Sequence, residues 1–381
     1  MATGHDEIVG RARELAPTIA ARAAATEAAR TPRDDTIAEL IDAELFSILV
    51  PERWGGLGLG LHTHREVVEI VSAVCMSTGW VTAFYSGHNW LACKFPEATQ
   101  EEVFAGRGYA MIPITAAPTM SLTEVDGGVR VSGRSSWGTG VMHGDWVSVG
   151  GFTAERAYMV LLPISDVEVV DVWHMAAMSG TGSNDFVIDD VFVPEARTAD
   201  LFAFGGGDTE GARLHDDWFR MPMMAFLHCE AIPVFVGGLR GAANAFEDIV
   251  RHRVTTHAGT VKADDRYTHI QLGAALAAAN AAERLLVDQI DATLALVPGE
   301  LTLPERARLK GQAGFVVDLA RRAVNEMAIH AGTSNYATDS PIQRFFRDIN
   351  MLATHAFWDW EVTREQVGRI GLDLDATTPL V

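Results

Sequence analysis

Two short stretches near the C-terminus carry most of the information about the fold. Ser-Pro-Ile-Gln-Arg-Phe-Phe-Arg-Asp occupies residues 340–348, and Thr-His-Ala follows at residues 354–356. The first stretch contains an Arg-x-x-Arg-Asp core, after a segment of glycine and proline that interrupts the preceding helical pattern. No acidic residue occurs between Asp348 and Asp359, whereas His355 stands in that interval. We therefore expect a last helix followed by a histidine rather than by a carboxylate, with Arg347 and Asp348 as a buried structural pair.

The pattern upstream of this stretch changes from helix to strand and back. Residues 1–110 read as helical, and valines in period-two alternation, broken by Gly, Asp and Pro, follow from residue 111 to about 200. Helical periodicity returns after about residue 220, and two long Ala-rich segments there are suited to close helix packing. We therefore predict an α+β chain with an N-terminal helical domain at 1–110, a central antiparallel β domain at 111–215 and a C-terminal four-helix bundle at 216–381.

Composition excludes several classes of function. The chain has 381 residues, 48% of them hydrophobic, and a formal net charge of -20. A negative field of this size disfavours nucleic acid and anionic membrane surfaces. The three cysteines, Cys75, Cys93 and Cys229, lack the spacing of a metal site or a disulfide framework. With no signal peptide and no apolar run of about 18 residues, we expect a cytoplasmic protein that binds neither nucleic acid nor membrane.

Four segments, spread over nearly the whole chain, carry a resemblance to a known fold. They are Val-Pro-Glu-Arg-Trp-Gly-Gly-Leu-Gly at 50–58, Gly-Arg-Ser-Ser-Trp-Gly-Thr-Gly at 133–140, the stretch from Trp173 to Glu195, and the helix from Arg344 to Asp348. In this order they resemble the acyl-CoA dehydrogenase fold. Dehydrogenases of that fold often place a base carboxylate near position 356, where this chain has alanine.

The absent carboxylate and the histidine are similar to the flavin-dependent monooxygenase branch of that superfamily. Gly-Thr-Gly-Ser-Asn-Asp at 180–185, His-Gly-Asp-Trp at 143–146 and Thr-His-Ala at 354–356 resemble two-component aromatic hydroxylases, such as the oxygenase components acting on p-hydroxyphenylacetate and on steroid-derived phenols. The resemblance implies a homotetramer. It also implies reduced flavin (FMNH2 or FADH2) from a separate NAD(P)H:flavin reductase, and O2, which together form a C4a-hydroperoxyflavin that hydroxylates a small aromatic substrate.

The resemblance also nominates residues for the flavin and the substrate. Trp137 and Thr139 lie on a segment that looks like the flavin-facing strand, with Trp137 packing near the ring and Thr139 as the partner of flavin N5. His88 is the candidate that accepts the proton of a phenol, because a phenolate ring is more easily attacked and histidine exchanges protons near neutral pH. His355 stands where the family places a histidine close to the flavin.

Phosphate binding requires positive charge or free backbone N–H groups. Arg253 falls where proteins of this fold carry a flavin-phosphate arginine. Gly332 and Thr333 resemble a loop that touches flavin phosphates across a subunit interface, although relatives often have two glycines there. No G-x-G-x-x-G, Walker or His-Glu-x-x-His motif occurs, so we expect neither a nicotinamide site of the Rossmann type nor a native metal site.

Three other hypotheses remain open. The same fold and flavin could oxidise a heteroatom, such as the nitrogen of an amino sugar or the sulfur of a thiophene. A true acyl-CoA dehydrogenase requires a base near residue 356, against which Ala356 argues. A helical scaffold without flavin is the third, and it predicts that no flavin binds.

Overall fold

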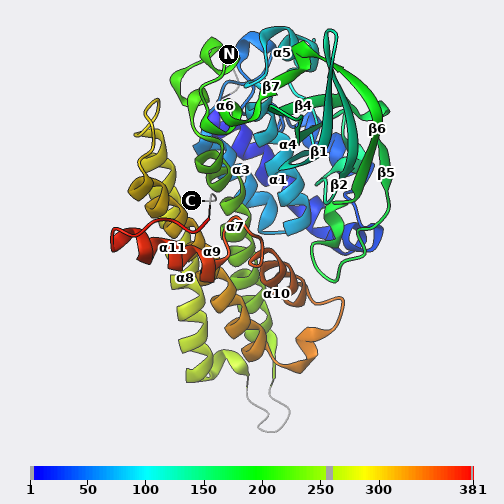
Figure 1. Cartoon of the computed structure of the whole chain (residues 1–381). Coiled ribbons are helices and arrows are strands. Elements are labelled where there is room, and N and C mark those ends of the chain that lie inside the picture. The colour runs from blue at the N-terminus through cyan, green and yellow to red at the C-terminus, as the bar shows by residue number, and fades with distance from the viewer. Residues whose placement is uncertain (1–3, 255–260, 379–380) are drawn as a thin grey trace.

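The computed structural model describes residues 4–254, 261–378 and 381. Its elements form a helical part, a sheet and a set of long helices that extend away from the sheet (Figure 1). The helix-strand-helix order confirms the predicted fold class. The helices of the first part are α1 (His5–Ala29), α2 (Asp34–Asp42), α3 (Leu61–Ser72), α4 (Met76–Ala92) and α5 (Glu97–Phe104).

Seven strands of the described chain form one sheet in the order β5-β6-β2-β1-β3-β4-β7. The sheet is antiparallel, as expected, except that β1 and β3 run parallel. β2 turns back antiparallel along one edge of β1, and β6 pairs with the other edge of β2. β3 therefore takes the free edge of β1 and runs in the same direction as β1. The strands are β1 (Ile114–Val125), β2 (Gly128–Ser135), β3 (Trp146–Phe152), β4 (Ala157–Pro163), β5 (Glu168–Val170), β6 (Asp185–Pro194) and β7 (Thr198–Asp200).

The third part is built from long helices that pack side by side. α7, α8 and α9 contact one another, and α10 and α11 pack against α9. The chain passes from helices to strands at 104–114 and from strands back to helices at 200–223. The helices are α6 (Leu201–Gly206), α7 (Met223–His252), α8 (Arg266–Leu294), α9 (Leu303–Ala331), α10 (Pro341–Leu352) and α11 (Trp360–Gly371).

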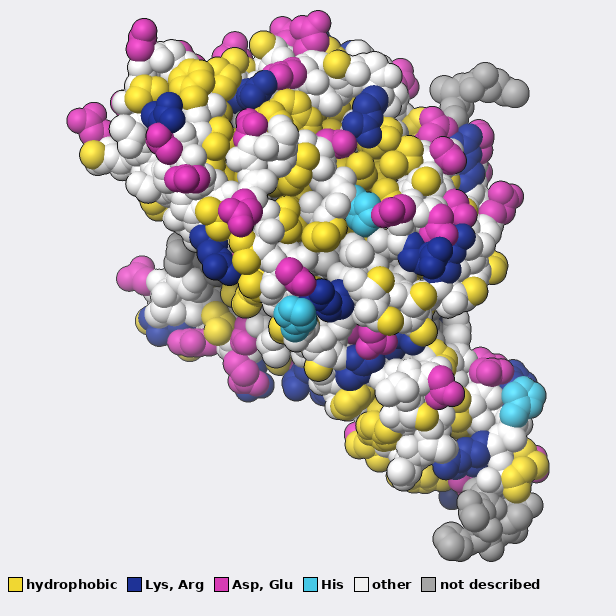
Figure 2. Space-filling model, turned by 90° about the vertical axis from the view of Figure 1, so that its right-hand side faces the viewer, with side chains coloured by type: hydrophobic (Ala, Val, Ile, Leu, Met, Phe, Trp, Pro, Cys, Tyr) yellow, Lys and Arg dark blue, Asp and Glu magenta, His cyan; other side chains and the backbone are white. Residues whose placement is uncertain are grey.

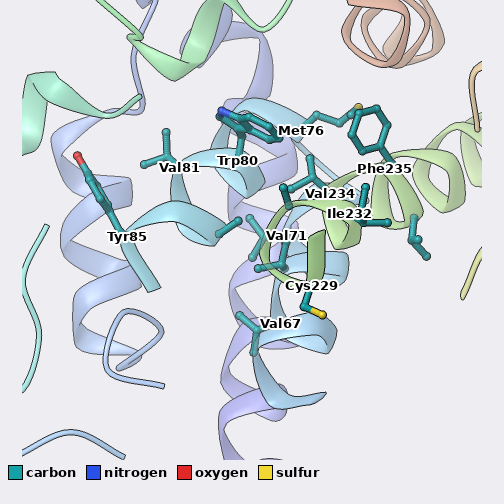
Figure 3. Packing of buried hydrophobic residues seen from close by; sticks show 14 of the residues in the cluster. Val67, Val71, Met76, Trp80, Val81, Tyr85, Cys229, Ile232, Val234 and Phe235 are labelled. Atoms are coloured by element: carbon teal, nitrogen blue, oxygen red, sulfur yellow. The ribbon is translucent and has the colours of Figure 1, made fainter. Parts of the chain in front are cut away.

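The core lies where α4 packs against α3 and α7. Almost every residue of α4 is buried. Figure 3 shows Val67 and Val71 from α3 close to Cys229 and Ile232 from α7, with Val81 and Trp80 of α4 next to each other. Among the described helices, α7 alone is long and apolar enough to cross a membrane, but 83% of its apolar window is buried within the protein. Packing against α3 and α4 therefore accounts for its hydrophobicity.

The deciding Arg-x-x-Arg-Asp stretch forms α10 and joins it to two distant segments. Arg344 and Arg347 both pair with Glu27 of α1. The backbone N–H of Met178 donates to Oδ1 of Asp348 at 2.6 Å. Arg347 and Asp348 thus have separate hydrogen-bond partners, because successive positions on a helix point in different directions. α10 consequently fixes the loop before β6 against the helical parts.

The surface carries charges of both signs. Figure 2 shows acidic and basic side chains interspersed over one face of the molecule, without a continuous basic patch on that face. The chain as a whole has a formal net charge of -20. Neither observation favours a polyanionic partner.

Candidate active site

One face of α4 carries a row of ring side chains. Trp80, Phe84 and His88 follow one another at intervals of four residues, which places them on the same side of the helix. The ring centroids of Trp80 and Phe84 lie 4.5 Å apart, and those of Phe84 and His88 lie 4.9 Å apart with nearly parallel planes. Sequence reasoning found His88 alone, although the four-residue spacing was visible in the sequence.

His88 is held in one tautomer. Its Nδ1 contacts the backbone carbonyl of Ile112, and because a carbonyl only accepts, Nδ1 is the nitrogen that carries hydrogen. Nε2 is therefore left with a free lone pair, and it lies 3.9 Å from Oε1 of Glu230. Burial lowers the pKa of His88 to about 4, so the ring is a neutral base at neutral pH. An unprotonated Nε2 can accept the hydrogen bond of a phenol O–H and take its proton as the phenolate forms, although the lowered pKa makes the ring a weaker base than a histidine in water.

Thr139 lies at the other end of the ring row. The indole N–H of Trp80 donates to Oγ1 of Thr139 at 3.2 Å, and the hydroxyl of Ser183 lies 3.1 Å from the same atom. Thr139 is nearly buried. Thr139 lies in the loop between β2 and β3, and it connects that loop to α4 through Trp80 and to the loop between β5 and β6 through Ser183. Trp80 and Ser183 were missed by the sequence analysis.

Trp137 stands out from the protein surface beside this cluster. Its ring is 64% exposed and meets Trp173 edge-on at 6.4 Å. Its backbone N–H donates to Oδ1 of Asp185, and its φ of 65° is in the left-handed region. We expected Trp137 and Thr139 on a strand, but β2 ends at Ser135. The left-handed backbone at Trp137 does not continue a strand, and the segment is a loop that presents the indole.

His355 joins the cluster from the segment between α10 and α11. Its ring stacks on Trp358 with centroids 4.6 Å apart and lies edge-on to Trp80 at 6.5 Å. Burial lowers the pKa of His355 to about 4. The structure thus brings Thr139 and His355 together at Trp80, and Phe84 links Trp80 to His88 at the other end of the ring row.

The predicted phosphate residues form a second group, at the far end of the long helices. Arg253 follows α7, and its guanidinium donates to the carbonyl of Ala331 at the end of α9. Gly332 has a φ of 83°, and a Cβ on it would stand 2.7 Å from Nη1 of Arg253. Nζ of Lys262 donates to the carbonyl of His330 at 2.6 Å.

This second group has the character of an anion site, but it is remote from the ring cluster of the same chain. Thr333 begins the short helix that follows Gly332. Arg253 and Lys262 supply positive charge beside a residue without a side chain, which suits phosphate. In Figure 1 the ends of α7 and α9 lie away from the sheet and from α4. We call Arg253, Lys262, Gly332 and Thr333 the cationic corner.

Comparisons with known proteins identify the family. The N-terminal domain of acyl-CoA dehydrogenases matches residues 4–103, and their C-terminal domain matches residues 231–360. The chain is 41% identical to the pigment production hydroxylase of a Rhodococcus species, over 98% of both chains. It is 31% identical to the FADH2-dependent resorcinol hydroxylase oxygenase component of a Rhizobium species, over 97% of this chain and 95% of that one.

A solved structure agrees with this assignment. The crystal structure of the HsaA monooxygenase from Mycobacterium tuberculosis superposes with a TM-score of 0.91 and 29% identity, covering 99% of this chain and 100% of that one. The chain therefore belongs to the flavin-dependent monooxygenases of the acyl-CoA dehydrogenase fold.

Proposed function

We propose that this protein is the oxygenase component of a two-component monooxygenase that hydroxylates a phenolic substrate with reduced flavin and O2. The observation that carries the proposal is His88, a buried neutral base whose Nε2 is free and whose ring continues the row of Phe84 and Trp80. A row of aromatic rings that ends in a proton acceptor suits a planar molecule with one ionisable hydroxyl.

The residues present fit a flavin. Trp137 offers an exposed aromatic face next to Thr139, and the cationic corner offers charge and a bare backbone for phosphate. When bound, reduced flavin supplies the electrons that activate O2. The chain's own residues hold the substrate, exclude water and take its proton: His88 accepts the phenol proton at Nε2, and Thr139 and Trp80 keep the neighbouring loop closed against α4.

The dehydrogenase alternative lacks its base, because residue 356 is alanine and its side chain is exposed. We propose FADH2 rather than FMNH2, since the resorcinol hydroxylase relative is FADH2-dependent. A separate NAD(P)H:flavin reductase, a homotetrameric assembly and a cytoplasmic location complete the proposal.

The test is a reconstituted assay. The purified protein is supplied with a flavin reductase, NADH and either FAD or FMN, and a panel of phenols is offered together with an amino sugar and a thiophene. We expect a hydroxylated phenol that carries an oxygen atom from isotopically labelled O2, formed faster with FAD. Oxygen found only on nitrogen or sulfur would shift the assignment to heteroatom oxidation, and flavin oxidation without any organic product would contradict the proposal.

A further inference from the structure

Glu230 is a carboxyl group buried inside the protein without a visible structural purpose. It lies on α7, its side chain has 0% exposure, and neither carboxyl oxygen has a hydrogen-bond partner among the described residues. α4 makes space for it at Gly87, where a Cβ would stand 1.9 Å from Oε1 of Glu230. A buried polar group without a hydrogen-bond partner lowers the stability of the fold. A fold that keeps such a group at Glu230 therefore points to a functional role for its carboxyl group.

The surroundings of Glu230 keep it uncharged. On α4, Nε2 of His88 is 3.9 Å from Oε1, and on α3 the Nε2 of His64 contacts the backbone carbonyl of Glu230 rather than its carboxyl group. In the described part of the chain, no arginine or lysine forms an ion pair with Glu230. Burial therefore raises the pKa of Glu230 well above its usual range, which favours the neutral carboxylic acid over the carboxylate.

The distance between His88 and Glu230 suits one shared oxygen atom. At 3.9 Å, Nε2 and Oε1 are too far apart for a direct hydrogen bond. A single oxygen placed about 2.8 Å from each atom spans this distance. The two groups are also complementary in kind, since Nε2 of His88 accepts and a carboxylic acid donates. A hydroxyl group, which donates once and accepts as well, satisfies both.

We propose that Glu230 is a further catalytic residue, which donates a hydrogen bond from its carboxylic acid to the same phenol oxygen that gives its proton to His88. The step is a proton transfer alone: the O–H bond of the phenol breaks, the proton joins Nε2 of His88, and the electron pair stays on oxygen. The resulting phenolate then accepts hydrogen bonds from Nε2–H and from Glu230. A carboxylic acid kept neutral by an apolar site is suited to stabilise such an anion. This inference rests on the proposed phenolic substrate.

The test measures the acidity of a bound phenol in the absence of flavin. para-Nitrophenol is the probe, because only its phenolate absorbs visible light, and its absorbance is followed against pH in wild-type protein, Glu230→Gln and Glu230→Met. The amide of glutamine still donates a hydrogen bond, whereas methionine does not. We expect the bound probe to have nearly the same pKa in wild type and Glu230→Gln, and a pKa raised by about one in Glu230→Met, equivalent to roughly tenfold weaker phenolate binding.

A matched control comes from the neighbouring helix. Glu69 on α3 is a largely buried carboxyl whose pKa burial raises to about 7, but it pairs with Arg65 and not with His88. Glu69→Gln should leave the pKa of the bound probe unchanged. A thermal unfolding curve of Glu230→Met checks that this variant is folded. Its melting temperature should be no lower than that of wild type, because an apolar side chain replaces a buried acid without a hydrogen-bond partner.

The outcomes separate this inference from the proposed function. If the enzyme hydroxylates phenols but Glu230→Met leaves the pKa of the bound probe unchanged, or the probe does not bind the wild-type site, the role of Glu230 is wrong and the proposed function stands. If both Glu230 variants raise the pKa equally, the carboxyl does not act as a neutral donor. If the shift is found but no phenol is hydroxylated, His88 and Glu230 form a phenol-binding pair and the proposed reaction is wrong.

Discussion

At the scale of single residues, burial decides what His88 can do. A histidine in water is half protonated near neutral pH, but burial lowers the pKa of His88 to about 4, and the Ile112 carbonyl assigns its proton to Nδ1. The ring therefore presents an unprotonated Nε2 over the whole neutral range. The same histidine on the surface would be partly protonated at neutral pH and free to turn, so Nε2 would be neither reliably unprotonated nor fixed in direction.

Replacement of His88 by asparagine should uncouple the reaction. The variant lacks a group that takes the phenol proton, so we expect hydroxylated product to fall by about a hundredfold while reduced flavin is still consumed. Product and NADH consumption are measured in the same assay. His62→Asn is the control, because His62 is partly exposed on α3 and pairs with Asp291 rather than with a residue of the ring row. Equal losses in both variants would contradict a specific role for His88.

At the scale of elements, α10 is coupled to pH through Asp348. Burial raises the pKa of Asp348 to about 6, from an ordinary value of 3.8. The folded protein binds the carboxyl proton of Asp348 more tightly than the unfolded chain does. The stability that comes from this proton binding is fully present below about pH 4 and is lost as pH rises through 6. Both the protonated and the ionised carboxyl have an oxygen that can accept the hydrogen bond from the Met178 N–H, which holds the loop before β6.

Asp348→Asn should therefore gain stability relative to wild type as pH rises. The asparagine oxygen still accepts from Met178, but it never ionises. We expect the free energies of unfolding of the two proteins to be similar near pH 4 and to diverge by on the order of 2 kcal/mol above pH 6 in favour of the variant. Urea unfolding at several pH values measures this difference. A difference that stays constant with pH would mean that Asp348 ionises normally in the folded protein.

At the scale of the whole molecule, the candidate site is divided. α4, which carries Trp80, lies beside the sheet, and α7 and α9, which end at the cationic corner, extend away from it (Figure 1). If the corner holds the phosphates of flavin bound to another copy, as the resemblance implies, then the chain needs its oligomer to complete the site.

Arg253→Met alone should weaken FAD binding about tenfold or more, because it removes the fixed positive charge.

Mixed oligomers test this arrangement. Arg253→Met and His88→Asn proteins are unfolded and refolded together, and their hydroxylation is compared with that of each variant alone. If every site combines the ring cluster of one copy with the cationic corner of another, about one quarter of randomly formed sites have both parts intact, and activity returns to about that fraction of wild type. No recovery in verified mixed oligomers would show that one copy supplies both parts.

The sequence by itself determined the order of helix and strand, the family and most of the residues worth testing. Periodicity of side chains reports local structure, and the motifs around Trp137, Thr139 and His355 are contiguous, so both are readable without coordinates. Only the tertiary structure showed that Thr139 and His355 meet at Trp80, that Trp137 lies on a loop, and that Arg253 is remote from them. It also revealed Glu230, which in the sequence is one acid within an apolar helix. These relations depend on how α4 packs against α7 and on the loops beside the sheet, and packing between distant segments leaves no periodic trace along the chain.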